Sequence, residues 1–145
     1  MQLPANILVP IDFSDLSEAA LDYAVKLAGR LDAKVHLLHV IGIPAMGVPE
    51  LGVAMTSSVI DSLVVDTQRE LDRLADARRA LAPIGEVIIS TGDARDAIVH
   101  TCEQVKADLI VMGTHGRRGV RRALLGSVAE TVVRTAPCAV LTLRA

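Results

Sequence analysis

The chain has 145 residues, a usual size for one domain that folds without disulfides or metals. Its net charge of -2 and its single Phe and single Tyr argue against a nucleic-acid partner, because such binding needs excess positive charge and stacking surfaces. Hydrophobic residues make up 51% of the chain and aromatic residues only 1%, so the core is expected to be aliphatic. Such a core is typical of parallel sheets covered by helices.

The N-terminal segment predicts a strand, a helix and a second strand. Asn6 to Asp12 is an apolar run that ends at an acidic residue, and Ser14 can cap a helix that follows it. Lys34 to Val40 predicts the second strand. The helix face expected to pack on the sheet consists of Leu16, Ala20, Tyr23, Leu27 and Leu31.

Residues 42 to 58 carry Gly, Pro and Met with almost no charge and no sustained period. They predict a long loop, which is either a functional flap or contact surface or a tolerated surface insertion. A long helix is expected next, ending at Pro83. Its inward positions are expected to be Ile60, Leu63, Thr67, Leu71, Leu74 and Leu81.

The rest of the chain continues the alternation of strands and helices. Strands are expected at 86–90, 108–112 and 139–143, with a helix after the turn at 91–93. The buried face of that helix is expected to hold Ala97, Ile98, Thr101, Cys102 and Val105, with His100 towards solvent. The pattern predicts a single doubly wound, three-layer α/β domain with a parallel sheet, a Rossmann-like fold.

Two further features bear on the cellular location. The first residues show no signal-peptide pattern, and no apolar run is long enough to cross a membrane. Cys102 and Cys138 are far apart in sequence and lack zinc-type spacing. We expect free thiols in a cytoplasmic protein with no membrane partner.

A glycine-rich stretch follows the fourth expected strand. Gly113 and Gly116 are followed after nine residues by Gly126 and Ser127. Glycine lets a backbone turn sharply and come close to a ligand, and the N–H groups of a helix start can bind an anion. This is phosphate-binding chemistry, although no Gly-Lys-Ser/Thr of a Walker A loop is present. The alternative is a glycine-rich crossover that only joins a strand to a helix.

This spacing resembles the nucleotide-binding motif of the universal stress protein family, in its ATP-binding branch. The run Val9 to Ser14 resembles the family's first-strand motif, and Leu38 to Val40 resembles the end of its second strand. The resemblance covers residues 1–145 as one domain of the adenine-nucleotide α-hydrolase-like group. It implies five parallel strands in the order 3-2-1-4-5.

The resemblance also implies a ligand, ATP with Mg²⁺, and a set of residues that hold it. Around the adenine and ribose it places Pro10, Ile11, Asp12, Val40, Met112 and Gly113. Along the phosphates it places Thr114, His115, Gly116, Gly126, Ser127 and Val128. Ala129 departs from the pattern, because some relatives have a hydroxyl residue there.

Several of these residues have a second interpretation. Asp12 can cap the turn after the first strand, and His115 can be an ordinary loop histidine rather than a phosphate donor or phosphoacceptor. His36 and His39 are three apart on a strand, so they point to opposite faces and are expected to be satisfied histidines. The cluster Arg117, Arg118, Arg121 and Arg122 could reach a polyphosphate or form a solvated flap.

The function that follows is an ATP-binding stress-response or signalling module with at most slow ATP hydrolysis. A homodimer through Cys138 to Leu143 is implied by the family, together with a protein partner that the sequence does not identify. Two alternatives are a nucleotide-free dimeric interaction module and an ATP-using enzyme of the α-hydrolase-like group. The sequence does not separate ATP from AMP, ADP or other adenine nucleotides.

Overall fold

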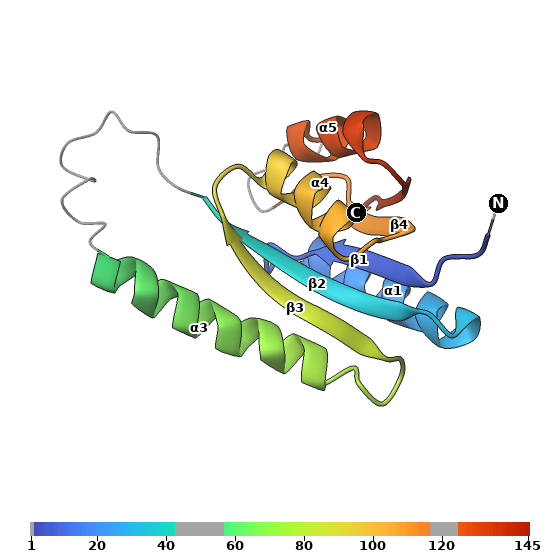
Figure 1. The fold of residues 1–145 in the computed structure, drawn as a ribbon, viewed down its shortest axis with the longest axis horizontal. Helices are drawn as coiled ribbons and strands as arrows, with labels where there is room; N and C mark the ends of the chain where they lie inside the picture. The colour runs from blue at the N-terminus through green and yellow to red at the C-terminus, as the bar shows by residue number, and fades with distance from the viewer. Residues whose placement is uncertain (1, 43–56, 117–124) are drawn as a thin grey trace.

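The computed structural model describes residues 2–42, 57–116 and 125–145 (Figure 1). Most of the expected 42–58 loop and the four arginines from Arg117 to Arg122 lie outside these ranges. The strands are β1 (Asn6–Pro10), β2 (Lys34–Ile41), β3 (Ile84–Thr91), β4 (Leu109–Gly113) and β5 (Ala139–Leu143). The helices are α1 (Asp15–Leu31), α3 (Ser57–Asp76), α4 (Ala94–Gln104) and α5 (Ser127–Thr135).

The five strands form one parallel sheet in the order β3-β2-β1-β4-β5. In the centre, Ile7 of β1 pairs with Val35 of β2 on one side and Leu109 of β4 on the other. The predicted fold class and strand order are therefore confirmed. The strand order reverses between β1 and β4, so the carboxyl ends of these two strands flank the crevice where such sheets usually bind ligands.

Helices cover both faces of the sheet (Figure 1). Helices α1 and α3 enclose one aliphatic core with residues such as Ile7, Leu37 and Leu71, whereas α4 and α5 enclose a second core with Leu8 and Ile110. Alternate residues of each buried strand thus face opposite layers. Within the described ranges, no helix combines the length and apolar character needed to span a bilayer.

Helix α1 starts as predicted, and its buried face agrees with the prediction in part: Ala20 is buried, and Leu27 and Leu31 pack against the core. The Ser14 side chain accepts a hydrogen bond from the Ser17 N–H and caps the helix. Tyr23 is 44% exposed, so its predicted inward position is wrong. The small side chains of Ala20, Ala24 and Ala28 allow the helix to approach the sheet closely. The buried residues are Ser17, Ala20, Leu21, Ala24, Val25 and Ala28.

Helix α3 is shorter than predicted. It ends at Asp76 rather than at Pro83, and Leu63 and Leu81 are 41% and 63% exposed instead of inward. The Arg78 side chain donates to the Leu74 carbonyl and to Asp22 of α1, which satisfies the helix end. The chain then turns through residues 77–82, so Leu81 no longer follows the helical period.

Helix α4 agrees with the prediction more closely. Its buried residues are Ala97, Ile98, Thr101 and Cys102, and His100 is exposed. Val105 is only half-buried because the helix has already ended at Gln104. Strand ends differ from the predicted ones by one or two residues at β1, β2, β3 and β4.

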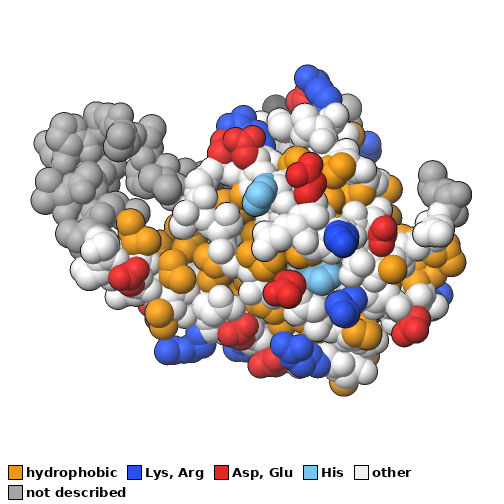
Figure 2. Space-filling view, in the orientation of Figure 1, with side chains coloured by type: hydrophobic (Ala, Val, Ile, Leu, Met, Phe, Trp, Pro, Cys, Tyr) orange, Lys and Arg blue, Asp and Glu red, His pale blue; other side chains and the backbone are white. Residues whose placement is uncertain are grey.

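Charged side chains of both signs are interspersed on the face shown in Figure 2. Ion pairs such as Arg134 with Glu130 and Arg73 with Glu70 join neighbouring turns of one helix. Their side chains are largely exposed, so water screens these pairs and they contribute little to stability. The stability of the fold therefore resides mainly in the two aliphatic cores.

His36 is a buried histidine with both ring nitrogens bonded. The Glu86 N–H donates to its Nδ1 at 2.9 Å, and its Nε2 lies 3.1 Å from Asn6 Oδ1. Gly85 makes this position possible, because a Cβ there would lie 2.5 Å from the ring. Burial, followed by the charge of Lys34, lowers the pKa of His36. The interpretation of a satisfied histidine is confirmed, within the protein rather than at its surface.

We expect the free energy of unfolding to decrease as the pH falls below about 6.5, the ordinary pKa of an unfolded histidine. The unfolded chain takes up a proton at His36 there, whereas the folded chain keeps the ring neutral because Nδ1 accepts from Glu86. Urea unfolding between about pH 5 and 7.5 measures this slope. His36→Gln should flatten it, while His100→Gln at an exposed position should leave it unchanged. Identical slopes in all three proteins would contradict this assignment.

Candidate functional site

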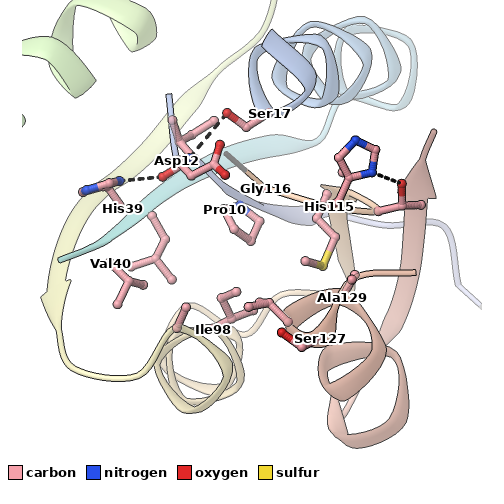
Figure 3. Close-up of a pocket in the computed structure, with 18 residues that line it drawn as sticks. Pro10, Asp12, Ser17, His39, Val40, Ile98, His115, Gly116, Ser127 and Ala129 are labelled. Carbon is pink, nitrogen blue, oxygen red and sulfur yellow. Dashed lines mark hydrogen bonds between the residues drawn. The ribbon is translucent and has the colours of Figure 1, made fainter. Parts of the chain in front are cut away.

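A cavity of about 530 Å³ opens at the carboxyl ends of β1, β2 and β4 and is closed by the starts of α4 and α5 (Figure 3). Its volume is in the range of small-molecule sites. All twelve residues predicted from the sequence line it: Pro10, Ile11, Asp12, Val40, Met112, Gly113, Thr114, His115, Gly116, Gly126, Ser127 and Val128. Segments that are more than a hundred residues apart in sequence therefore meet at one place.

Six further residues line the cavity and were not predicted as site residues. They are Ser17, Leu38, His39, Ala94, Ile98 and Ala129. A signal was present for His39 and Leu38, because they precede Val40 at a strand end. Ala94 and Ile98 come from the first turns of α4, whose position over the crevice depends on tertiary packing.

The turn after β1 is built around the Asp12 carboxylate. Asp12 Oδ1 accepts hydrogen bonds from the N–H and the hydroxyl of Ser14. The Asp12 N–H approaches the Ser17 hydroxyl (Figure 3). Phe13, between them, has a φ of 62°, in the left-handed region that non-glycine residues rarely adopt. Asp12 thus has the turn-capping role weighed from the sequence, and it also lines the cavity.

His39 fixes the wall next to this turn. Its Nδ1 lies 2.6 Å from the Ile11 carbonyl oxygen, which can only accept, so Nδ1 carries the proton. The ring packs against Phe13 with centroids 4.8 Å apart. This contact joins the end of β2 to the end of β1. Figure 3 shows Val40, Pro10 and Ile98 around the part of the cavity beside it, which is largely apolar.

The opposite part of the cavity is formed by the segment after β4 and the start of α5. The Gly126 N–H donates to the Thr114 carbonyl at 2.6 Å, which ties the two together. A Cβ at Gly126 would lie 2.9 Å from that carbonyl, and a Cβ at Gly116 would overlap Asp12 Oδ2. Glycine is therefore required here for close approach between protein segments.

Helix α5 begins at this wall, and the residues of its start line the cavity. Gly126 is the N-cap and has no side chain to bond the first-turn N–H groups, which include those of Ser127 and Val128. Ser127 adds a hydroxyl to the lining, while Ala129 is buried and adds none. The amides and the positive end of the helix dipole form a site suited to an anion.

His115 lies at the edge of the wall formed by the segment after β4 and the start of α5. Its Nδ1 is 3.2 Å from the Thr114 hydroxyl, and Thr114 itself is 3% exposed (Figure 3). Among the described residues that line the cavity, the carboxylate and imidazole groups besides His115 are those of Asp12 and His39. Across residues 2–42, 57–116 and 125–145, no three His, Cys, Asp or Glu side chains come together in a group that could hold a metal ion.

Comparison with known proteins agrees with this arrangement. A family model described as the universal stress protein family matches residues 5–144. The chain belongs to the universal stress protein family. The universal stress protein MJ0531 of Methanocaldococcus jannaschii is 36% identical over 148 residues, which cover 96% of this chain and 81% of that protein.

Solved structures show the same fold. UspA of Lactobacillus plantarum superposes with a TM-score of 0.78 at 32% identity, with 97% of both chains covered. A universal stress protein in complex with cAMP superposes with a TM-score of 0.69 at 28% identity, covering 99% of this chain and 98% of that one. The strand order of the present chain is therefore that of its family.

Substitution of Asp12 can show whether its oxygen acceptor or its negative charge stabilises the turn after β1. Asp12→Ala removes the acceptor for Ser14 and is expected to lower the free energy of unfolding by about 1–3 kcal/mol. Asp12→Asn keeps an oxygen acceptor in the turn, so its loss is expected to stay below about 1 kcal/mol. Urea unfolding of the two variants beside the wild type measures the difference. Equal losses would show that the negative charge, rather than the turn acceptor, stabilises this end of β1.

Proposed function

We propose that this universal stress protein binds an adenine nucleotide, ATP with Mg²⁺, and acts as a nucleotide-dependent stress-response or signalling module. The observation that carries the proposal is the cavity, which combines an apolar part with a glycine-lined helix start in one volume of nucleotide size. A nucleotide has the same division, with a flat base at one end and phosphates at the other.

The apolar part would hold the base. Ile11 and Val40 offer a slot between the ends of β1 and β2, and Ile98 closes it from α4. Asp12, beside this slot, would accept from ribose hydroxyls. The polar backbone of Met112 to Gly116 would then follow the sugar towards the phosphates.

The phosphates would lie against α5. The N–H groups of Ser127 and Val128 and the Ser127 hydroxyl are the donors that this wall supplies. Mg²⁺ is usually held by substrate phosphates and one or two carboxylates, and Asp12 is the carboxylate that lines the cavity. His115 and the arginines at 117, 118, 121 and 122 stay candidates for further phosphate contacts. We expect any hydrolysis to be slow.

The comparison with solved structures supports a nucleotide as the ligand, without pointing to ATP in particular. The structural relative that holds cAMP shares 28% of its sequence and nearly its whole length with this chain. An adenine nucleotide with one phosphate is therefore a second ligand to test beside ATP. A cytoplasmic location remains the expectation from the sequence.

We also propose that the protein forms a homodimer through the C-terminal strand, predicted from Cys138 to Leu143. Strand β5 is at the edge of the sheet, with β4 on one side only. An edge strand presents unpaired backbone groups that a second copy can pair with. The Leu143 carbonyl accepts from the Thr114 N–H, so the backbone groups of Leu143 face inward and those of Thr142 face the open edge.

We expect saturable binding of Mg-ATP to the nucleotide-stripped protein in calorimetric titration. Gly116→Val should abolish it, because the added side chain overlaps Asp12 and displaces the loop at the phosphates. Ser127→Ala should weaken binding by about tenfold, the cost of one hydrogen bond to a charged group. Titration with cAMP under the same conditions compares the two ligands.

Thr135→Ala is the matched control for Ser127→Ala. It removes a hydroxyl from the other end of α5, where the Thr135 hydroxyl donates only to the Thr131 carbonyl. Its affinity should equal that of the wild type. A folded wild type that binds no adenine nucleotide would overturn the proposal and favour a nucleotide-free interaction module.

Thr142→Pro is expected to convert the dimer to a folded monomer. Proline removes the outward N–H needed for pairing with a second copy but keeps the inward pairing of β5 with β4. Sedimentation velocity measures the assembly state, and Thr142→Ala, which keeps the N–H, should remain dimeric. A Thr142→Pro dimer would place the interface elsewhere.

A further inference from the structure

Cys102 and Cys138 lie side by side although they are 36 residues apart in sequence. Their Sγ atoms are 3.2 Å apart, and both are free thiols. Cys102 is near the end of α4, and Cys138 directly precedes β5. Neither residue lines the cavity described above. We propose that this pair is an oxidation site, at which a small-molecule disulfide converts the two thiols into an intramolecular disulfide.

The two thiols differ in access. Cys102 is 1% exposed and packs in the core beneath α4 and α5, whereas Cys138 is half-buried at the margin of that core. In the separate chain an incoming disulfide can therefore reach Cys138, but it cannot reach Cys102 without local opening of the structure. The reaction is accordingly proposed for the separate chain, because the homodimer proposed above includes Cys138 in its interface. The accessible thiol, Cys138, can attack the oxidant, and the shielded thiol, Cys102, can then attack the mixed disulfide formed at Cys138.

The contact between the sulfurs supports the same assignment. Burial, and then the hydrogen bond with Cys138, raises the pKa of Cys102 to about 12. Burial also raises the pKa of Cys138, but the hydrogen bond with Cys102 opposes this effect. The thiolate that attacks forms more readily at Cys138.

The reaction balances with glutathione disulfide as oxidant. The Cys138 thiol loses its proton and attacks one glutathione sulfur, the S–S bond of the oxidant breaks, and the first glutathione leaves with a proton. Cys102 then loses its proton and attacks the Sγ of Cys138, which releases the second glutathione. One oxidant disulfide is reduced to two thiols, and two protein thiols are oxidised to one disulfide.

The disulfide between Cys102 and Cys138 would close a covalent loop in the chain. The chain between Cys102 and Cys138 includes β4 and α5, and with them the cavity segments Met112–Gly116 and Gly126–Ala129. Closing a loop of this length restricts the unfolded chain more than the folded one. The oxidised protein should therefore unfold at a Tm roughly 10 °C higher than the reduced protein.

The test is intact-mass analysis after incubation of the reduced full chain with glutathione disulfide. The wild type should lose two hydrogen atoms without gaining glutathione, become resistant to alkylation in urea, and return to two free thiols with dithiothreitol. Peptide mapping should link Cys102 to Cys138. A wild type that keeps both thiols, stops with glutathione attached, or links two chains would overturn the proposal.

Single variants separate the two roles. Cys102→Ser should stop at the stage with one glutathione on Cys138, since the resolving thiol is absent. Cys138→Ser should leave Cys102 unmodified in the folded protein, with its thiol reacting only after unfolding in urea. A Cys102 that reacts in the folded Cys138→Ser protein would reverse the assigned order. The double variant should show no change in Tm with oxidant, which separates the cross-link from other effects of oxidation.

Discussion

The turn held by the Asp12 carboxylate connects the central strand to the rest of the site. Its Oδ1 fixes Ser14, and Ser14 in turn caps α1. Its Oδ2 lies so close to Gly116 that a Cβ there would force the carboxylate to shift. One side chain thus sets where β1 ends, how α1 starts and how far the segment after β4 can advance into the crevice. The anion-binding wall depends on that advance, because the Gly126 N–H bonds the Thr114 carbonyl.

The sequence predicted the elements that depend on local patterns. Strand order, helix caps and the gathering of twelve residues at one cavity follow from hydrophobic runs, glycine spacing and resemblance to a family motif. On α1, the helical spacing of apolar residues predicts Tyr23 as inward, whereas Tyr23 is exposed. The alanines pack there instead, since they let the helix approach the sheet. Which residues of α1 face the sheet depends on the packing of the whole helix–sheet interface, and the local sequence pattern does not indicate it.

The missed residues of the site share a tertiary cause. His39 enters the lining because its ring bonds the Ile11 carbonyl of a neighbouring strand and packs on Phe13. Ile98 enters because α4 and α5 pack together over the sheet. Neither contact is between residues that are near in sequence. Spacing can indicate which chemistry a loop supplies, but which side chains close the far wall depends on how the layers meet.

The core between α4, α5 and the sheet supports two features at once. Ile98 and Ala129 contribute both to this core and to the cavity wall, and Cys102 packs within it on the same helix as Ile98. Because closely packed interiors deform little, a change in the packing of Cys102 is expected to disturb Ile98, which lies in the same core and lines the cavity. The thiol pair and one wall of the cavity therefore share a single packed layer, and a cross-link between Cys102 and Cys138 would restrain local unfolding of that layer.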